Sequence, residues 1–215
     1  VHDAPVTIAL RAASDAEDDA ATTESAAPRQ ALAVFGPQPN LTYSFISALL
    51  VQYAAFHAPN DARLVLLAPQ EAQNAWRWAL RLPHVTASGP GQTVCFEDAR
   101  DRQGEKEHNK MAIFLRALRK TLEDRRMRLG DDDSAAAATL PHLLIVVDLL
   151  AIPPRSATGG GSVLDDLELE PGISLLMHEG ARLGVSVIFL APHSGRAPSG
   201  CQAVIELTPG TLDQD

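Results

Sequence analysis

His142-Leu-Leu-Ile-Val-Val-Asp148 and Leu176-Met-His-Glu-Gly-Ala-Arg-Leu-Gly-Val-Ser-Val-Ile-Phe-Leu-Ala-Pro192 are the two stretches that decide the fold. The first is a short apolar run that ends in an acid, as expected of a strand buried on both faces of a parallel sheet. The second is typical of a helix that ends near Gly184 and leads into another apolar strand, Val185–Leu190. Together they predict two parallel strands joined by a helical crossover.

The rest of the chain alternates apolar runs with helical patterns in the same way. Further strands are expected at residues 5–10, 31–35, 62–67, 93–96 and 202–207. Helices are expected after Pro39, at 69–82, at 107–128 and at 172–183. Strands that alternate with helices predict an α/β fold, with a mostly parallel sheet and helices on both of its faces.

Length and composition are those of a single globular domain, residues 1–215. Apolar residues make up 46% of the chain, and no apolar run approaches the roughly 18–20 residues that cross a bilayer. The chain starts at Val1 with neither an initiator methionine nor a signal region, so we expect a fragment of a longer protein, with any membrane anchor outside it. Cys95 and Cys201 lack metal-site spacing and are expected to be unpaired, in a reducing compartment.

Charge is distributed unevenly along the chain. The formal net charge of −9 argues against a general nucleic-acid binder. Ten of the eighteen lysines and arginines fall between Arg100 and Arg128, which we expect to form a solvated helix face. Residues 12–28 are small and acidic, and residues 129–139 and 153–162 are rich in small residues, so flexible segments are expected at all three places.

The loop after the strand at 31–35 invites comparison with a phosphate-binding loop. Its sequence is Gly36-Pro-Gln-Pro-Asn-Leu-Thr-Tyr43, whereas the pattern G-x-x-x-x-G-K-[ST] requires glycine, lysine and serine or threonine where Leu41, Thr42 and Tyr43 stand. Pro37 and Pro39 also lack the backbone N–H groups that would wrap a phosphate. We therefore expect a vestigial nucleotide site and no ATP hydrolysis.

Asp148 has two interpretations. An acid at the end of an apolar strand can order the water shell of a magnesium ion in ATPases, with a second acid often following it. Here Leu149 follows, and no lysine stands in the loop, so we favour a carboxylate that caps a neighbouring turn or helix. The predicted vestigial site consists of Gly36, Thr42, Tyr43 and Asp148, and no bound cofactor is expected, although magnesium and ATP stay open.

Other chemistry-bearing residues give weaker signals. The histidines occur singly without metal-site spacing, and the serines lack a nucleophile-elbow context, so neither a metal site nor a hydrolase is expected. Trp76 and Trp78 are two positions apart on the expected helix and cannot both face one core. We expect one of them at the surface beside Arg77 or Arg81, where it could contact another domain.

Two segments carry a family resemblance. Glu179-Gly-Ala-Arg-Leu-Gly-Val-Ser-Val-Ile-Phe-Leu-Ala-Pro-His193 resembles the helix, glycine and strand that follow the Walker B acid in FtsK/SpoIIIE-type motor ATPases. Trp76-Arg-Trp-Ala-Leu-Arg-Leu-Pro-His84, after the strand at 62–67, resembles a W-x-W…L-P-H element of EccC/EssC-like ATPases of type VII secretion. The likeness covers most of residues 30–207, and it implies a P-loop NTPase-like (RecA-like) sheet.

The resemblance implies a role in a membrane motor. In those proteins the ATPase-like module nearest the membrane often lacks a working phosphate loop, so this chain is expected to be a non-hydrolysing module in assembly or regulation of the translocation machine. Its expected partners are adjoining ATPase modules of the same chain, further copies in a hexamer and other secretion components, on the cytoplasmic side of the membrane. Two alternatives stay open: an active nucleotide-binding ATPase or DNA translocase, and a DNA-binding module that uses the arginine-rich helix.

Overall fold

The computed structural model describes residues 31–86, 93–98, 109–129, 140–152 and 162–208. The strand expected at 5–10 and the acidic segment 12–28 lie outside these ranges, as do all but the first residue of 129–139 and all but the last of 153–162. No described helix is long and apolar enough to span a bilayer.

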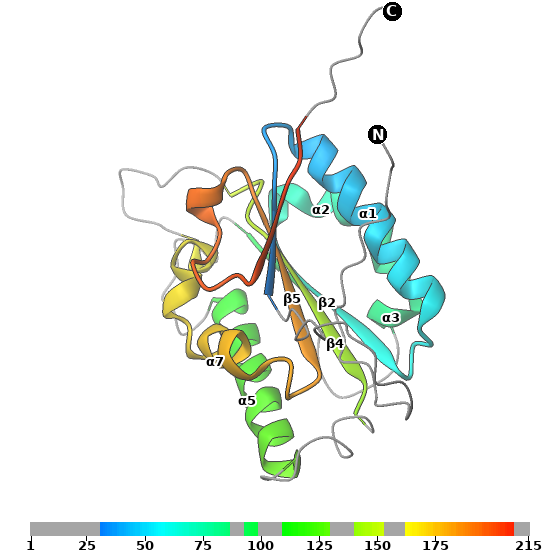
Figure 1. Cartoon of the computed structure of the whole chain (residues 1–215), viewed down its shortest axis with the longest axis vertical. Coiled ribbons are helices and arrows are strands. Elements are labelled where there is room, and N and C mark those ends of the chain that lie inside the picture. The colour runs from blue at the N-terminus through cyan, green and yellow to red at the C-terminus, as the bar shows by residue number, and fades with distance from the viewer. Residues whose placement is uncertain (1–30, 87–92, 99–108, 130–139, 153–161, 209–215) are drawn as a thin grey trace, which may run out of the picture.

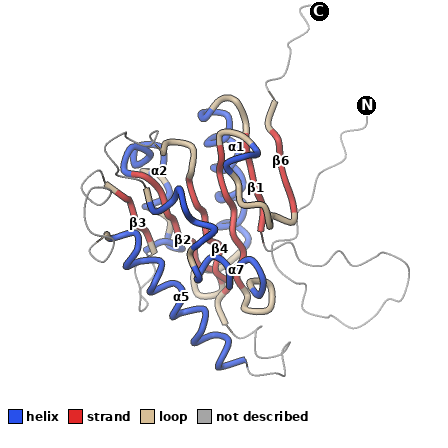
Figure 2. Tube along the Cα trace, turned by 90° about the vertical axis from the view of Figure 1, so that its left-hand side faces the viewer, coloured by secondary structure: helices blue, strands red, loops and turns tan. Residues whose placement is uncertain are grey.

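The described residues form one sheet of six parallel strands, ordered β3-β2-β4-β5-β1-β6 (Figure 2). The strands are β1 (Ala31–Phe35), β2 (Ala62–Pro69), β3 (Val94–Glu97), β4 (His142–Asp148), β5 (Val185–Ala191) and β6 (Ala203–Glu206). All seven residues of β4 and of β5 are buried, because helices cover both faces of the sheet. The predicted α/β class is confirmed, and the strand arrangement is that of a RecA-like P-loop fold.

The helices form two layers (Figure 1). One layer holds α1 (Pro39–Phe56), α2 (Gln73–Trp76) and α3 (Pro83–Thr86), and the other holds α5 (Lys110–Leu129) and α7 (Pro171–Glu179). Short 3₁₀ turns, η1 (Gln70–Ala72), η2 (Ala79–Arg81), η3 (Val163–Leu169) and η4 (Ser194–Arg196), connect these elements. Because all six strands are parallel, each crossover returns the chain to the same end of the sheet.

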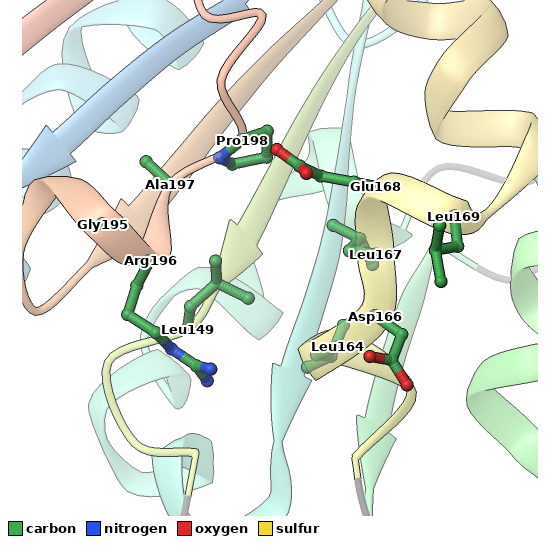
Figure 3. Close-up of a pocket in the computed structure, with 10 residues that line it drawn as sticks. All are labelled: Leu149, Leu164, Asp166, Leu167, Glu168, Leu169, Gly195, Arg196, Ala197 and Pro198. Atoms are coloured by element: carbon green, nitrogen blue, oxygen red, sulfur yellow. The ribbon is translucent and has the colours of Figure 1, made fainter.

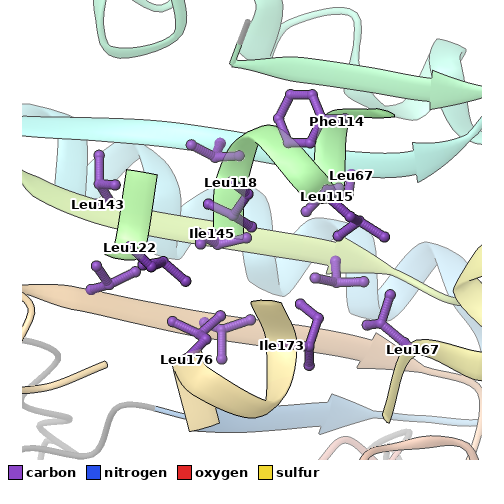
Figure 4. Close-up of a cluster of buried hydrophobic side chains, with 14 of the residues drawn as sticks. Leu67, Phe114, Leu115, Leu118, Leu122, Leu143, Ile145, Leu167, Ile173 and Leu176 are labelled. Atoms are coloured by element: carbon purple, nitrogen blue, oxygen red, sulfur yellow. The ribbon is translucent and has the colours of Figure 1, made fainter. Parts of the chain in front are cut away.

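Two apolar cores result, one on each face. On the α5 side, Leu115, Leu118 and Leu122 pack with Ile145 and Leu176 (Figure 4). On the α1 side, Ile46, Leu50 and Trp76 pack against alternate residues of the same strands, such as Leu144 and Val146. Successive strand residues point to opposite faces, so one apolar run supplies both cores.

Three predicted helices differ from the structure, one in type and two in their ends. The helix expected at 69–82 is instead η1, α2 and η2 in succession, because i→i−3 hydrogen bonds such as Leu82 N–H to Ala79 O tighten the turns. Helix α5 begins at Lys110 rather than at 107, since Asn109 Oδ1 caps it by accepting from the N–H groups of Met111 and Ala112, at 2.8 and 3.1 Å. Helix α7 ends at Glu179, and Gly184, with φ of 66°, closes the turn that follows.

The arginine-rich helix is not solvated on every side. Arg125 is buried, and its guanidinium donates to Leu183 O at 2.9 Å and Pro141 O at 2.6 Å. These carbonyls precede β5 and β4, so Arg125 ties the C-terminal part of α5 to the amino ends of the two central strands. The pKa of Arg125 is lowered to about 10, mainly by burial and then by the neighbouring charges of Arg63 and Arg128. Arg125 therefore stays cationic at neutral pH.

Candidate functional site

The carboxyl ends of the strands are where parallel α/β sheets place ligands. At this edge the loop after β1 leads from Gly36 into α1, whose first residue is Pro39. Helix α1 begins beside the end of β4, as the contact between its Tyr43 and Asp148 shows. The four residues of the predicted vestigial site therefore lie at one edge of the sheet, on the loop after β1, on α1 and at the end of β4, with β5 between the two strands. Of the four, the side chains of Tyr43 and Asp148 are in direct contact.

Asp148 is fully buried and is the hub of the site. Its Oδ2 atom accepts two hydrogen bonds, from Tyr43 Oη at 2.8 Å and from Trp76 Nε1 at 2.7 Å. Its Oδ1 atom accepts the N–H of Leu150 at 2.9 Å, which closes the turn after β4. The predicted capping role is seen in that last bond, whereas the bonds from two aromatic side chains were not predicted.

The aromatic pair encloses the carboxylate. Tyr43 and Trp76 meet edge to face, with ring centroids 6.0 Å apart and an interplanar angle of 88°. Burial raises the pKa of Asp148, and the hydrogen bonds from Trp76, Leu150 and Tyr43 oppose that rise. Burial and the adjacent Asp148 charge in turn raise the pKa of Tyr43, so its hydroxyl remains a donor.

The residues on the other side of the loop are closely packed. Thr42 is fully buried, and its Oγ1 atom has no hydrogen-bond partner among the described residues. A Cβ placed on Gly36 would lie 3.0 Å from Leu207 O and 3.4 Å from Thr42 Oγ1. Gln38 O accepts the N–H groups of Leu41 and Thr42, at 3.1 and 3.3 Å. Gly36 thus lies in close contact with the chain after β6, where a larger residue would make Leu207 shift.

The prediction that Trp76 and Trp78 cannot both face one core was wrong, because both pack in the α1-side core and neither is largely exposed. Trp76 is 1% exposed and points at Asp148. Trp78 is half-buried and packs against the α1-side core rather than being substantially exposed. Arg77 and Arg81 flank it and are exposed. Any contact made by this region would therefore use the outer edge of Trp78 and the two guanidinium groups.

The histidine of the W-x-W…L-P-H element has a structural contact. His84 is buried, and its Nε2 lies 2.8 Å from His57 O at the end of α1. Trp76 anchors one end of this segment to β4, and His84 anchors the other end to α1. The element therefore fixes how α1, α2 and α3 sit on the sheet.

Two buried polar clusters were not predicted from the sequence. At the carboxyl end of β3, Glu97 accepts from Ser162 Oγ and from the N–H of Val163 at 2.9 Å, which ties β3 to η3. At the opposite edge, His142 Nδ1 lies 2.6 Å from Tyr53 Oη and its Nε2 lies 3.2 Å from Ser186 Oγ. Each cluster joins residues far apart in sequence, so spacing could not reveal it.

A separate pocket of about 240 Å³ lies on the α5 side of the same edge (Figure 3). Its apolar lining includes Leu149 and Leu167, and Arg196 faces Asp166 across it. Because Leu149 and Asp148 point to opposite faces of the sheet, this pocket does not open onto the carboxylate. Among the described residues, no group of three or more His, Cys, Asp or Glu side chains could hold a metal ion.

Comparison of the sequence with known proteins found one relative over a short stretch. No protein-family model matches the chain. Over 46 residues, 21% of this chain and 4% of the relative, it is 41% identical to the ESX secretion system protein EccC of Thermomonospora curvata. The chain thus spans only a small part of this curated relative.

Solved structures of the same group share the fold. The cytoplasmic domain of the type VII secretion ATPase EccC from T. curvata matches with a TM-score of 0.56 and 17% identity, over 82% of this chain and 20% of that one. The cytoplasmic domain of EssC matches with a TM-score of 0.54 and 13% identity, over 82% of this chain and 32% of that one. T. curvata EccC (ATPases 2 and 3), in complex with a signal sequence peptide, matches with a TM-score of 0.53 and 16% identity, over 80% of this chain and 29% of that one. The predicted resemblance is confirmed, and at these identities it is a likeness of fold.

Proposed function

We propose that this chain is a non-hydrolysing ATPase-like module of a type VII secretion-like motor, which acts in assembly or regulation of the translocation machine. The observation that carries the proposal is the pair of hydrogen bonds from Tyr43 and Trp76 to one oxygen of Asp148. In a working site that carboxylate orders the magnesium shell. Here the protein's own donors hold it in a buried position.

The loop before α1 supports the same conclusion. A magnesium–nucleotide group needs a cationic side chain, a hydroxyl for the metal and several free backbone N–H groups. Thr42 is buried at the lysine position, Pro37 has no N–H, and the N–H groups of Leu41 and Thr42 bond to Gln38 O. The residues present do not fit a bound magnesium–nucleotide group.

The position after Asp148 also argues against hydrolysis. In many related ATPases a second acid there positions the attacking water. Leu149 is 4% exposed and packs in the α5-side core, so its side chain cannot contact a water at the nucleotide side of the sheet.

The proposed partners follow from the comparisons and from one surface. The chain covers a third or less of two structures described as cytoplasmic domains, and of a third described as containing ATPases 2 and 3. The multi-ATPase relatives support adjoining ATPase modules as partners. We further propose a hexameric assembly, other secretion components as partners and a place at the cytoplasmic side of a membrane. Trp78, Arg77 and Arg81 are the proposed contact surface toward a neighbouring module, because aromatic and arginine residues are favoured interface anchors.

Phosphate release from Mg-ATP tests the proposal. The 215-residue chain should give no turnover above buffer, and the double variant Thr42→Lys with Tyr43→Ser should remain inactive. Two changes do not restore the missing N–H of Pro37 or an acid at Leu149. The matched control is Tyr53→Phe, which alters α1 away from the carboxyl edge. Magnesium-dependent turnover by the parent would favour the alternative, an active ATPase.

A further inference from the structure

Helix α1 has an outer face without any charged residue. No Asp, Glu, Lys or Arg occurs between Arg29 and Asp61, although 21% of the residues of the whole chain are charged. Of the three described α-helices with more than four residues, α5 carries nine charged residues and α7 carries Glu179, whereas α1 carries none. The solvent face of a surface helix is ordinarily charged or polar, so α1 differs from a helix that only covers its own sheet.

This outer face is exposed and partly apolar. The exposed residues along its middle recur at i, i+4, i+7 and i+11 and are Ser44, Ala48, Val51 and Ala55. Val51 is 51% exposed, and Phe56, the last residue of the helix, is 83% exposed. Figure 1 shows α1 on the outside of its layer. An exposed apolar face without charge indicates a protein contact, because the centres of protein interfaces are depleted of charged residues.

The charges of the other faces favour a second copy of the chain as the occupant. The protein carries a net charge of −9, α5 presents six exposed bases, and Arg77 and Arg81 flank Trp78. Two copies that met through either basic face would bring like charges together, which costs several kcal/mol. Through α1 they meet without opposed like charges and without stripping water from an unpaired charge. A two-fold axis pairs such a face with itself.

We propose that α1 packs against α1 of a second copy in a two-fold symmetric contact. The helix has 18 residues and is therefore about 27 Å long and about 10 Å wide. The strip that two such helices cover is well below the roughly 800 Å² per partner of a standard stable interface. The isolated chain should therefore form a weak dimer that is populated at high concentration. This contact does not depend on whether the nucleotide site is vestigial.

Sedimentation equilibrium of the 215-residue chain measures the dimer. From about 10 µM to about 1 mM, the mean mass should rise from 22.9 kDa toward double that value. Val51→Lys should abolish the rise, whereas Ile113→Lys, at a residue of α5 that is 49% exposed, should leave it unchanged. Both variants make the same change of charge, so a difference between them reports the α1 face.

Salt distinguishes this contact from an ionic one. About 0.5 M NaCl should leave the dimer intact or strengthen it, because salt screens the repulsion between two chains of net charge −9. A dimer that becomes tenfold weaker in salt would overturn the proposal, because an ionic contact, such as the basic face of α5 against an acidic surface, would then hold the copies together.

A spin label locates the contact without altering the α1 face. The label is placed at Asn60→Cys, in the exposed turn after α1, with Cys201→Ser because Cys201 is the more accessible native cysteine. Mixed at high concentration with unlabelled, isotopically enriched protein, it should broaden amide signals of residues 40–56 and spare residues 113–127 of α5. Broadening that omits α1 overturns the proposal. A mass that stays at 22.9 kDa, with no broadening, also overturns it.

Discussion

The buried carboxyl group of Asp148 is unfavourable in its charged form, but it accepts hydrogen bonds from three donors. Its carboxylate lies fully out of solvent with three donors on two oxygens, from Tyr43, Trp76 and the backbone of Leu150. Desolvation is the largest influence on its pKa and raises it, and the hydrogen bonds only partly offset this. A raised pKa in the folded state means that the folded protein holds this proton more tightly than the unfolded chain does.

The raised pKa of Asp148 makes the stability of the fold depend on pH. Stability from the protonated carboxyl is fully present below the unfolded pKa of about 3.9 and is lost as pH rises through the folded pKa. The difference in unfolding free energy between the parent and Asp148→Asn should therefore shift against the parent as pH rises from about 4 toward neutrality. Denaturant titrations of both proteins at several pH values measure it. A difference that shifts in favour of the parent over that range would mean that the donors outweigh burial.

At the scale of elements, Arg125 is the clearest case of one side chain that fixes a helix. It donates to carbonyls before β4 and β5, so Arg125→Met would leave buried acceptors without a donor. We expect a loss of about 2–4 kcal/mol in unfolding free energy. Arg126→Met, the next position, removes only an exposed ion pair with Glu179 and should cost at most about 1 kcal/mol. Chemical denaturation compares them, and equal losses would refute the anchoring role.

The elements themselves were largely predictable because their signals are local. The apolar runs at β1, β2, β4 and β5 and the long pattern of α5 correspond to observed elements. The segment at 69–82 was misjudged because its burial does follow helical spacing, with Ala72, Trp76 and Ala79 inside, while its hydrogen bonds follow the 3₁₀ pattern. Periodicity reports which side chains face inward, and it does not report which carbonyl each N–H selects.

The candidate site was predictable only in part. The bond from Leu150 N–H to Asp148 is between residues two apart and follows from the preference of aspartate for such turns. The partners Tyr43 and Trp76 are 105 and 72 residues from Asp148. Their contact depends on the order of strands in the sheet and on the tight turns η1 and η2 on either side of α2, neither of which a single sequence specifies.

On the scale of the whole molecule, the two faces carry different surfaces. The α1 side presents Trp78 between Arg77 and Arg81, and the α5 side presents the basic helix face. Trp78→Ala should weaken association with an adjoining module or a second copy by about 1–4 kcal/mol. Because Trp78 is half-buried, some loss of stability should accompany it. Sedimentation of the full-length protein measures assembly, with Met127→Ala on the opposite face as control. Unchanged assembly would assign Trp78 to packing alone.

The protein's own side chains, Tyr43 and Trp76, hold the carboxylate that a magnesium–nucleotide group would need. Calorimetric titration of Mg-ATP into the 215-residue chain tests it most directly, with Asp148→Asn titrated in parallel. We expect no saturable heat from either protein, with or without magnesium. Micromolar binding by the parent that requires magnesium and is lost in Asp148→Asn would contradict it, because Asp148 would then serve a nucleotide rather than Tyr43 and Trp76.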